Sequence, residues 1–420
     1  MAKYYFAPVK AKGAKYYWVM GILGALTLGW LIASYIRFIG GPYLTGLNHQ
    51  VTWAGPKVVF VLFVGLSAGS FIISALSAVF GQKEYKVLSR VGGFLAVLFI
   101  LAALLLLITD WGRPDRLFIV FDPNNINPTS MLSLNAFFYT TYMVIGIFYL
   151  WAQFKEHDRA MTGLAIAATV AAVFVHTGTG FIFAIANARE MLFTPVVPIA
   201  FVVAALSSGS GMIMNVLYFT FKLTGRSVDV RFFRQLSKVM LGLIIVVIYL
   251  MAVEHLMHLY VPEHREGELF VLFGEHGGQF FQWAFWGGLI TIGGIVPVFL
   301  LLYKRTKDNL KWILTAGGLH VFGVLCERML IILPGQMLPI SILPGYQISS
   351  AFGDGKIWNY LPSGYEWMQL IGIFAFVAFV YILGLRMLPL LPVEGRYVSE
   401  GKPKVTELDE IVEAELVGSR

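Results

Sequence analysis

The sequence predicts an all-α integral membrane protein with ten transmembrane helices. Of its 420 residues, 58% are apolar and only 13% are charged, and the mean hydropathy is +0.74. An average soluble domain carries roughly 25% charged residues. The chain contains apolar runs of about 20 residues, each long enough to cross roughly 30 Å of hydrocarbon. Apolarity within these runs is continuous rather than alternating, which favours helices over an outer-membrane barrel.

The apolar runs locate the expected helices along the chain. They cover approximately residues 17–39, 56–81, 88–109, 131–153, 161–186, 194–221, 236–257, 281–303, 311–333 and 366–390. Three connections are long, at about 110–130, 258–280 and 334–365. All three lie on one side of the membrane, and long connections in compact domains are usually functional. We therefore expect the working face on that side.

The basic residues predict the orientation in the membrane. Most of the 31 Lys and Arg residues fall in the two terminal segments and in every second connection. Such residues favour the cytoplasmic side, so we expect a multi-pass protein of the cytoplasmic membrane with both termini in the cytoplasm. The formal net charge of +7 then needs no nucleic acid partner to explain it. The basic start runs into a full-length helix with no small-residue cleavage site, so the first helix is the expected insertion signal.

A four-helix unit is predicted to occur twice. The pentapeptide at 66–70, LSAGS, returns as LSSGS at 206–210. The distance in sequence between the two copies pairs helices two to five with helices six to nine, and this suggests a duplicated unit. Because four helices restore the starting direction, the two copies must be parallel repeats. Rare ionisable residues follow nearly the same offset, in the pairs Asp110 with Glu254 and His176 with His320.

These features divide the chain into five expected units. They are 1–55, with a basic segment, the first helix and an outer loop; 56–190, the first four-helix repeat; 191–333, the second repeat; 334–392, an outer loop and the tenth helix; and 393–420, a cytoplasmic tail. Apolar positions within 405–417 fit one face of a short helix. A disordered acidic tail is the alternative.

Cys326 is the only cysteine. The chain can therefore hold neither an internal disulfide nor a four-thiolate iron–sulfur cluster or zinc site. Any such centre must belong to a partner.

Asp110 opens the segment DWGRPDR at the expected outer boundary of the third helix. A carboxyl group beside arginines is kept ionised, and the Gly-Arg-Pro turn is rigid. One interpretation is a loop salt bridge with Arg113 or Arg116. The functional interpretation is a proton acceptor or hydrogen-bond partner for a ligand that enters from the outer leaflet.

His176 and His320 are expected near the middle of the membrane, from their distances to the ends of their helices. A neutral imidazole donates one hydrogen bond and accepts another, which suits a quinone carbonyl or a proton relay. Packing histidines are the alternative, with Thr177 or Thr179 as local partners. A bis-histidine haem also needs two imidazoles at matched depth, but the usual paired-histidine pattern of two-haem proteins is absent, so we expect no haem.

A second group of ionisable residues lies near the expected outer ends of helices seven and nine. Glu254, His255 and His258 close one helix, and Glu327 and Arg328 lie near the end of the other. Histidine and glutamate clusters can bind zinc, but this spacing secures no zinc geometry, and we expect no metal. A proton outlet or a docking surface is the preferred interpretation. For Glu327 and Arg328 the alternatives are an interhelical ion pair and a proton chain that joins Glu254, Glu327 and His320.

Ten helices with a repeated unit, DWGRPDR after the third helix and NPTS at 127–130 resemble the NrfD or polysulfide-reductase (PsrC-like) membrane-subunit family. The resemblance covers roughly residues 56–333. It implies a subunit without its own redox centre that binds menaquinone or another quinone near the outer face. Electrons would pass to or from a ferredoxin-like iron–sulfur subunit docked there. The length and the segment at 176–181 are closer to the DsrP subunit of the Dsr redox complex, which implies dissimilatory sulfur metabolism.

By position, the resemblance places the quinone site at Asp110, Trp111, Arg113, His176 and Thr177. It places a proton path at Asp110, His176, Glu254, His255, His320, Glu327 and Arg328. The expected partners are the iron–sulfur subunit, other membrane and cytoplasmic redox subunits contacted through the tail, and membrane lipids. We expect oxidoreductase activity only as a subunit of such a complex.

Two other classes of function remain open. Repeats and ionisable groups within the membrane also occur in secondary transporters, although these usually show helices broken by Gly or Pro at the site. Here Pro195 and Pro198 lie near a helix start rather than a centre. The third possibility is a membrane anchor that binds no quinone.

Overall fold

The computed structural model describes residues 6–10, 13–79, 86–122, 124–186, 189, 191–226, 230–339, 341–343, 346–347 and 355–392. Within these residues it confirms the all-α membrane fold, with ten helices long and apolar enough to span a bilayer. The helix expected within 405–417 lies outside the described residues.

The ten spans follow the expected order. They are α1 (Ala14–Gly40), α2 (Gly55–Val79), α3 (Lys86–Thr109), α4 (Met131–Phe154), α5 (Asp158–Ala184), α6 (Val196–Thr224), α7 (Val230–Tyr260), a continuous span of α9 (Gln279–Trp283), η5 (Ala284–Ile295) and α10 (Val296–Leu302), then α11 (Leu310–Ile332) and α13 (Gly364–Met387). The segment η5 is a π-helix. Shorter helices are η1 (Pro42–Leu44), η3 (Pro114–Phe121), α8 (Pro262–Leu272), η4 (Glu275–Gly277) and α12 (Pro334–Met337).

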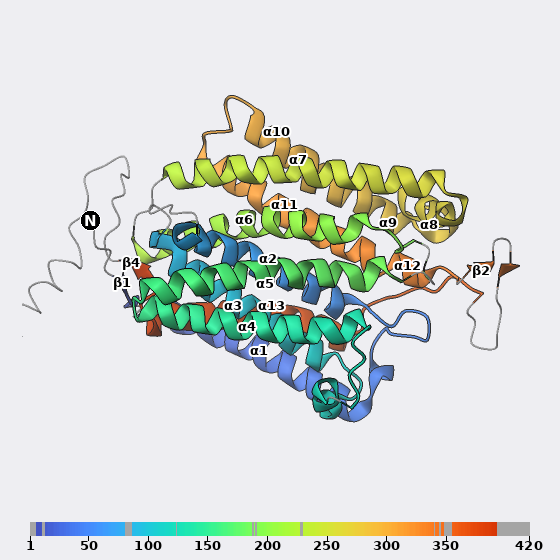
Figure 1. The fold of residues 1–420 in the computed structure, drawn as a ribbon, viewed down its shortest axis with the longest axis horizontal. Coiled ribbons are helices and arrows are strands. Elements are labelled where there is room, and N and C mark those ends of the chain that lie inside the picture. Colours follow the sequence, from blue (N-terminus) through green and yellow to red (C-terminus); the bar gives the residue numbers. More distant parts are fainter. Residues whose placement is uncertain are drawn as a thin grey trace, which may run out of the picture.

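Eight of the ten spans form two bundles that lie side by side (Figure 1). Helices α2, α3, α4 and α5 pack together as the first bundle, and α6, α7, the α9–η5–α10 span and α11 form the second. Helices α2 and α5 contact α6, and α2 also contacts α11. Helix α1 packs along α13, so helices from opposite ends of the chain adjoin each other beside α3. The expected four-helix units and their origin by duplication stay predictions.

The two ends of the described chain also meet. Strand β1 (Phe6–Ala7) pairs antiparallel with β4 (Leu391–Pro392). Both lie at one end of the bundle, on the left in Figure 1, and the second short sheet, of β2 (Ser341–Leu343) and β3 (Tyr346–Gln347), lies at the opposite end. This opposite end, where α3 finishes and α2 starts, is called the Asp110 end below.

Helix α2 is the central element of the bundle. In the most apolar stretch of α2, 94% of the residues are buried, against 17% in α1. An apolar surface that faces lipid needs no protein cover, so the low value for α1 identifies it as a peripheral helix. The long connection expected at 258–280 is partly helical, because α8 occupies 262–272.

The repeated pentapeptides face each other where α2 crosses α6. A methyl group on Gly69 would overlap the Gly209 backbone and lie 2.7 Å from the carbonyl oxygen of Ala205. Glycines therefore allow the two backbones to approach more closely than any other residue would. The echo in the sequence marks the contact between the two bundles.

We predict that Gly69→Ala lowers the free energy of unfolding by about 1–3 kcal/mol, because overpacking forces the helices apart. Gly242→Ala, in α7, is the matched control, since no atom lies within 4 Å of the added methyl group. Thermal unfolding of the purified variants in detergent measures both effects. Equal midpoints for Gly69→Ala and Gly242→Ala would show that the crossing tolerates a side chain.

Candidate functional site

A cavity of about 380 Å³ opens into the first bundle at the Asp110 end. Ligand pockets typically measure about 300–1,000 Å³. Its walls come from the loop before α2 and from α1 to α5. The lining is mostly apolar, and five of its twenty residues are aromatic, namely Trp53, Phe60, Trp111, Tyr139 and Phe183.

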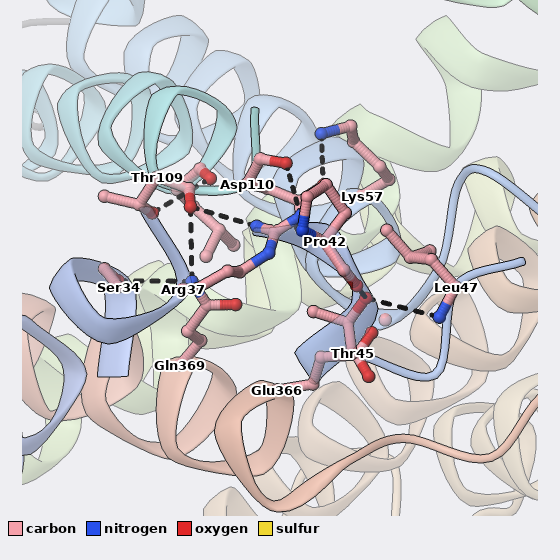
Figure 2. Close-up of polar contacts among 12 residues, drawn as sticks. Ser34, Arg37, Pro42, Thr45, Leu47, Lys57, Thr109, Asp110, Glu366 and Gln369 are labelled. Atoms are coloured by element: carbon pink, nitrogen blue, oxygen red, sulfur yellow. Dashed lines mark hydrogen bonds and ion pairs between the residues drawn. The ribbon is translucent and has the colours of Figure 1, made fainter. Parts of the chain in front are cut away.

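The charged lining of this cavity is a buried ion triad. The carboxylate of Asp110 accepts from Arg37 Nη1 at 2.6 Å through Oδ1, and it binds Lys57 Nζ through Oδ2. Figure 2 shows the two cations converging on Asp110, Arg37 from α1 and Lys57 from the start of α2. Burial of one charge without partners is costly, so each member depends on the others.

Arg37 is fixed by more than the carboxylate. Its guanidinium donates to the backbone oxygens of Thr109, at 3.0 Å, and Asp110, at 2.6 Å. These carbonyls lie at the end of α3, where helix carbonyls lack intrahelical partners. The arginine therefore caps α3 and holds Asp110 in place. Gln369 of α13 donates to the same Thr109 oxygen at 3.3 Å.

The loop before α2 is held in place by α12. Gln336 accepts hydrogen bonds from the backbone N–H groups of Thr52 and Trp53, at 3.0 and 2.9 Å, and donates to the Trp53 carbonyl at 2.9 Å. This contact places the Trp53 ring against the cavity and against Phe183, whose centroid is 5.6 Å away.

The structure separates the residues that the sequence assigns to the quinone site. Asp110 and Trp111 line the cavity. Arg113 does not: its exposed guanidinium pairs with Asp115 at 3.0 Å, and the pKa of Asp115 is lowered mainly by that hydrogen bond. The loop salt bridge of Asp110 with Arg113 or Arg116 is therefore wrong, because Arg37 and Lys57 occupy both carboxylate oxygens.

His176 and Thr177 lie on α5 but outside the cavity lining, which α5 supplies through Thr179, Ile182 and Phe183. His176 is buried, and its Nδ1 donates to the carbonyl of Ala172 at 2.9 Å. Its Nε2 is enclosed without a hydrogen-bond partner among the described residues. Thr179, the local partner considered from the sequence, instead bonds Tyr139 Oη at 2.7 Å.

A second, smaller cavity of about 40 Å³ lies at the same end of the second bundle. Its volume holds roughly two or three waters. Titratable side chains from α7, α8 and α11 line it: Glu254, His255, His258, Glu268 and Glu327. The structure thus brings together three residues that the sequence assigns to the proton path, and it adds His258 and Glu268.

Glu268 connects α8 to the end of α7. Its two oxygens lie 2.8 Å from His255 Nδ1 and 2.9 Å from His258 Nδ1. Burial favours a raised pKa for Glu268, but the hydrogen bonds from the two histidines outweigh it and lower the pKa below its usual 4.5. A carboxylate with both oxygens engaged in this way fixes both rings.

His320 and Arg328 lie outside the second cavity lining. His320 Nδ1 donates to the Gly293 carbonyl at 2.7 Å, and in the neutral ring Nε2 then accepts from Ser207 Oγ at 2.8 Å. Arg328 stacks 3.8 Å above the Phe201 ring. Its ion pair with Glu327, at 3.4 Å, joins neighbours on one helix rather than two helices.

Sequence reasoning missed Arg37 and Lys57. The signal was available, because Arg37 is an arginine inside an apolar segment, where a charge is costly and calls for a partner. Lys57 is a basic residue at the helix end predicted to lie on the side with few basic residues. Among the described residues no three His, Cys, Asp or Glu side chains are arranged to hold a metal ion.

Comparison with known proteins identifies the family. The family model described as polysulphide reductase, NrfD, matches residues 43–340, well over half of the chain. The chain belongs to the NrfD family. A similar protein is the integral membrane subunit of an Hdr-like menaquinol oxidoreductase from Archaeoglobus fulgidus, which is 37% identical over 389 residues, 92% of this chain and 96% of the relative.

Two further relatives also align over most of their length, but their sequence identity to this chain is lower. A subunit of the selenate reductase of Mesobacillus selenatarsenatis is 27% identical, over 91% of this NrfD-family chain and 96% of its own. A putative dimethyl sulfoxide reductase membrane subunit of Halobacterium salinarum is 29% identical, over 89% and 93% respectively. These names describe subunits of oxidoreductases that differ in their substrates.

We predict that Glu268→Gln speeds amide exchange in α8 roughly ten- to hundredfold at pH 7, because it removes a charged acceptor from both histidines. The pKa of Glu268 is lowered in the folded state, so its stabilising contribution is present above pH 4.5 and is lost as pH falls through the folded pKa. The difference between the variant and the native chain should therefore disappear in acid.

Hydrogen exchange with mass spectrometry, run on both proteins at each pH, measures this contribution. Glu266→Gln is the control, since Glu266 is exposed on the same helix. A difference that does not shrink as the pH falls below 4.5, or an equal effect of Glu266→Gln, would contradict the role of Glu268.

Proposed function

We propose that this chain is the quinone-interacting membrane subunit of a respiratory redox complex, with the quinone ring held in the cavity beside Asp110. The observation that carries the proposal is the combination of a 380 Å³ aromatic-lined cavity with one buried charged wall. Flat rings stack on aromatic side chains, and polar groups at one edge orient the ring oxygens. Family membership and the name of the Archaeoglobus fulgidus relative support menaquinol as the substrate.

Oxidation of a bound quinol releases two protons and two electrons. Asp110 is the carboxylate in the cavity lining, and its ion pairs with Arg37 and Lys57 hold it in position. We assign the proton acceptor to Asp110. His176 does not line the cavity, but it lies one helical turn before Thr179, which does. Its Nε2 has no hydrogen-bond partner among the described residues and is a second, buried candidate for the proton acceptor.

The electrons must pass between the quinol and a centre on another subunit. We place a ferredoxin-like iron–sulfur subunit at the Asp110 end, because the cavity lies there. This end would be the outer face of the membrane, with both termini in the cytoplasm. The two described chain ends meet at the opposite end, which agrees with their placement on one side. A role in dissimilatory sulfur metabolism stays a prediction from the resemblance.

The second cavity provides a candidate proton path. Glu254, His255, His258, Glu268 and Glu327 surround space for a few waters, and carboxylates with imidazoles can pass protons along such a chain. His320 and Arg328 would continue it into the bundle. Proton translocation by this route is part of the proposal.

We expect Asp110→Asn to reduce quinol oxidation by the purified complex roughly 100-fold, because a positioned base typically contributes 10²- to 10⁴-fold. Asp115→Asn is the control, an exposed acid on the same connection. The assay follows menaquinol oxidation in the native complex, with its bound quinone and iron–sulfur content determined first. Wild-type turnover in Asp110→Asn and in His176→Ala would remove the assignment of the site.

Absence of both quinone and quinol turnover in the native complex would favour a simple membrane anchor. Solute flux that needs no redox partner would instead favour a transporter.

We expect Glu254→Gln to leave quinol oxidation by detergent-solubilised complex within about twofold of wild type, because Glu254 lines the other cavity. In sealed vesicles the same variant should release fewer protons per electron, since a neutral amide cannot pass a proton. A pH-sensitive dye measures the proton yield. Glu263→Gln, an exposed acid of α8, is the control. An unchanged proton yield in Glu254→Gln would exclude this route.

A further inference from the structure

The ion triad leaves the cavity wall with an excess of positive charge. Among the described residues the charged groups of the lining are Arg37, Lys57 and Asp110, two cations and one anion. Arg37 and Asp110 have their charged groups buried, and the Lys57 side chain is 14% exposed. Charges in such a low-dielectric wall act on a ligand far more strongly than they would in water.

Lys57 is the member of the triad with accessible hydrogen-bond donors left for a ligand. An ammonium has three donors, and Asp110 Oδ2 is its hydrogen-bond acceptor within the described part of the chain. Arg37, in contrast, uses its two terminal nitrogens on Asp110 and on the backbone carbonyls at the end of α3. Its Nε has no hydrogen-bond partner among the described residues, but it is fully enclosed by protein and so not accessible from the cavity. Asp110, a carboxylate with one cation on each oxygen, has no hydrogen to donate to a ligand.

Glu366 is a further buried carboxylate at this end of the bundle, but it does not line the cavity. Its oxygens accept from the backbone N–H groups of Gly46 and Ser363, at 2.8 and 2.9 Å, and from Tyr360 Oη at 2.9 Å. These donors compensate its charge locally. The excess charge beside the cavity is therefore not cancelled at the ligand.

We propose that Lys57 is the ligand-contacting donor of this cavity, and that the Arg37–Asp110–Lys57 triad makes the site select ring ligands that carry a negative charge on a ring oxygen. The inference rests on the proposed quinone site and names its ligand class more narrowly. A neutral quinone satisfies the aromatic wall alone. A ligand with an ionised hydroxyl group on the ring also meets the ammonium through a charge-assisted hydrogen bond.

The test compares two probes that differ in one charge. A 2-hydroxy-3-alkyl-1,4-naphthoquinone is anionic at neutral pH, and its 2-methoxy analogue is neutral and of similar shape. The full chain is held in nanodiscs of zwitterionic lipid, and quenching of tryptophan fluorescence reports binding, since Trp53 and Trp111 line the cavity. The ratio of the two dissociation constants is the readout, because partial unfolding lowers the binding of both probes and leaves their ratio unchanged.

We expect wild type to bind the anionic probe roughly ten- to hundredfold more tightly than the neutral one, which corresponds to one hydrogen bond with a charged group. Lys57→Gln should reduce the preference to near unity, because the wall is then neutral. Lys57→Arg should keep it. Asp110→Asn should increase it above wild type, because the wall then has two uncompensated cations. Lys155→Gln, an exposed lysine at the other end, should leave it unchanged.

Equal affinity of wild type for the two probes, or a full preference in Lys57→Gln, would overturn the selection of anions while the quinone site itself stands. A lower preference in Asp110→Asn would overturn it as well. Failure of wild type to bind either probe would remove both this inference and the proposed function. Should Lys57→Gln bind neither probe, Lys57→Arg and Asp110→Asn still decide the outcome.

Discussion

The close crossing of α2 and α6 determines how the rest of this molecule is arranged. At Gly69 and Gly209 the two helix backbones meet without side chains between them. Lipid offers no hydrophobic drive for helix association, so close packing of this kind must supply much of the attraction. The serine two residues before each glycine bonds a partner on another helix. Ser67 donates to the Ala96 carbonyl at 2.6 Å, and Ser207 bonds His320 at 2.8 Å.

The crossing also explains why buried charges collect at one end of the bundle. Because α2 is central, its first turn lies inside the protein, and Lys57 there must find a partner. Asp110, at the end of the neighbouring α3, provides it, and Arg37 from the peripheral α1 completes the set. Arg37 can do this because α1 follows α13 along the first bundle and ends beside α3. Ion pairs therefore fix how helices from distant parts of the chain adjoin each other, because apolar contacts alone are not directional.

Hydropathy was sufficient to predict the ten helices, because a span needs only length and apolarity. The largest difference at a helix end is at α7, which begins at residue 230 rather than at 236. The echo predicted a repeated four-helix unit but not that the two pentapeptides touch. Asp110 was recognised as a candidate, whereas its partners were sought in the adjacent loop. Arg113 is close to Asp110 in the sequence, but its exposed guanidinium pairs with Asp115 instead. The buried carboxylate of Asp110 pairs with cations from other helices, such as the buried Arg37. Such pairings depend on which helices adjoin, which periodicity alone does not specify.

The two cavities at the Asp110 end differ in size and in charge, and these differences bear on what each can do. The first holds about 380 Å³ and has an excess of cations, while the second holds about 40 Å³ and is lined by three carboxylates and two histidines. A quinone ring is too large for the smaller cavity, which has room only for a few water molecules. A proton chain, in turn, is poorly supported by the aromatic wall of the larger one, where Tyr139 and Thr179 bond each other. The same end of the two bundles thus offers different surroundings to a ligand, because the side chains around Asp110 and Glu254 differ.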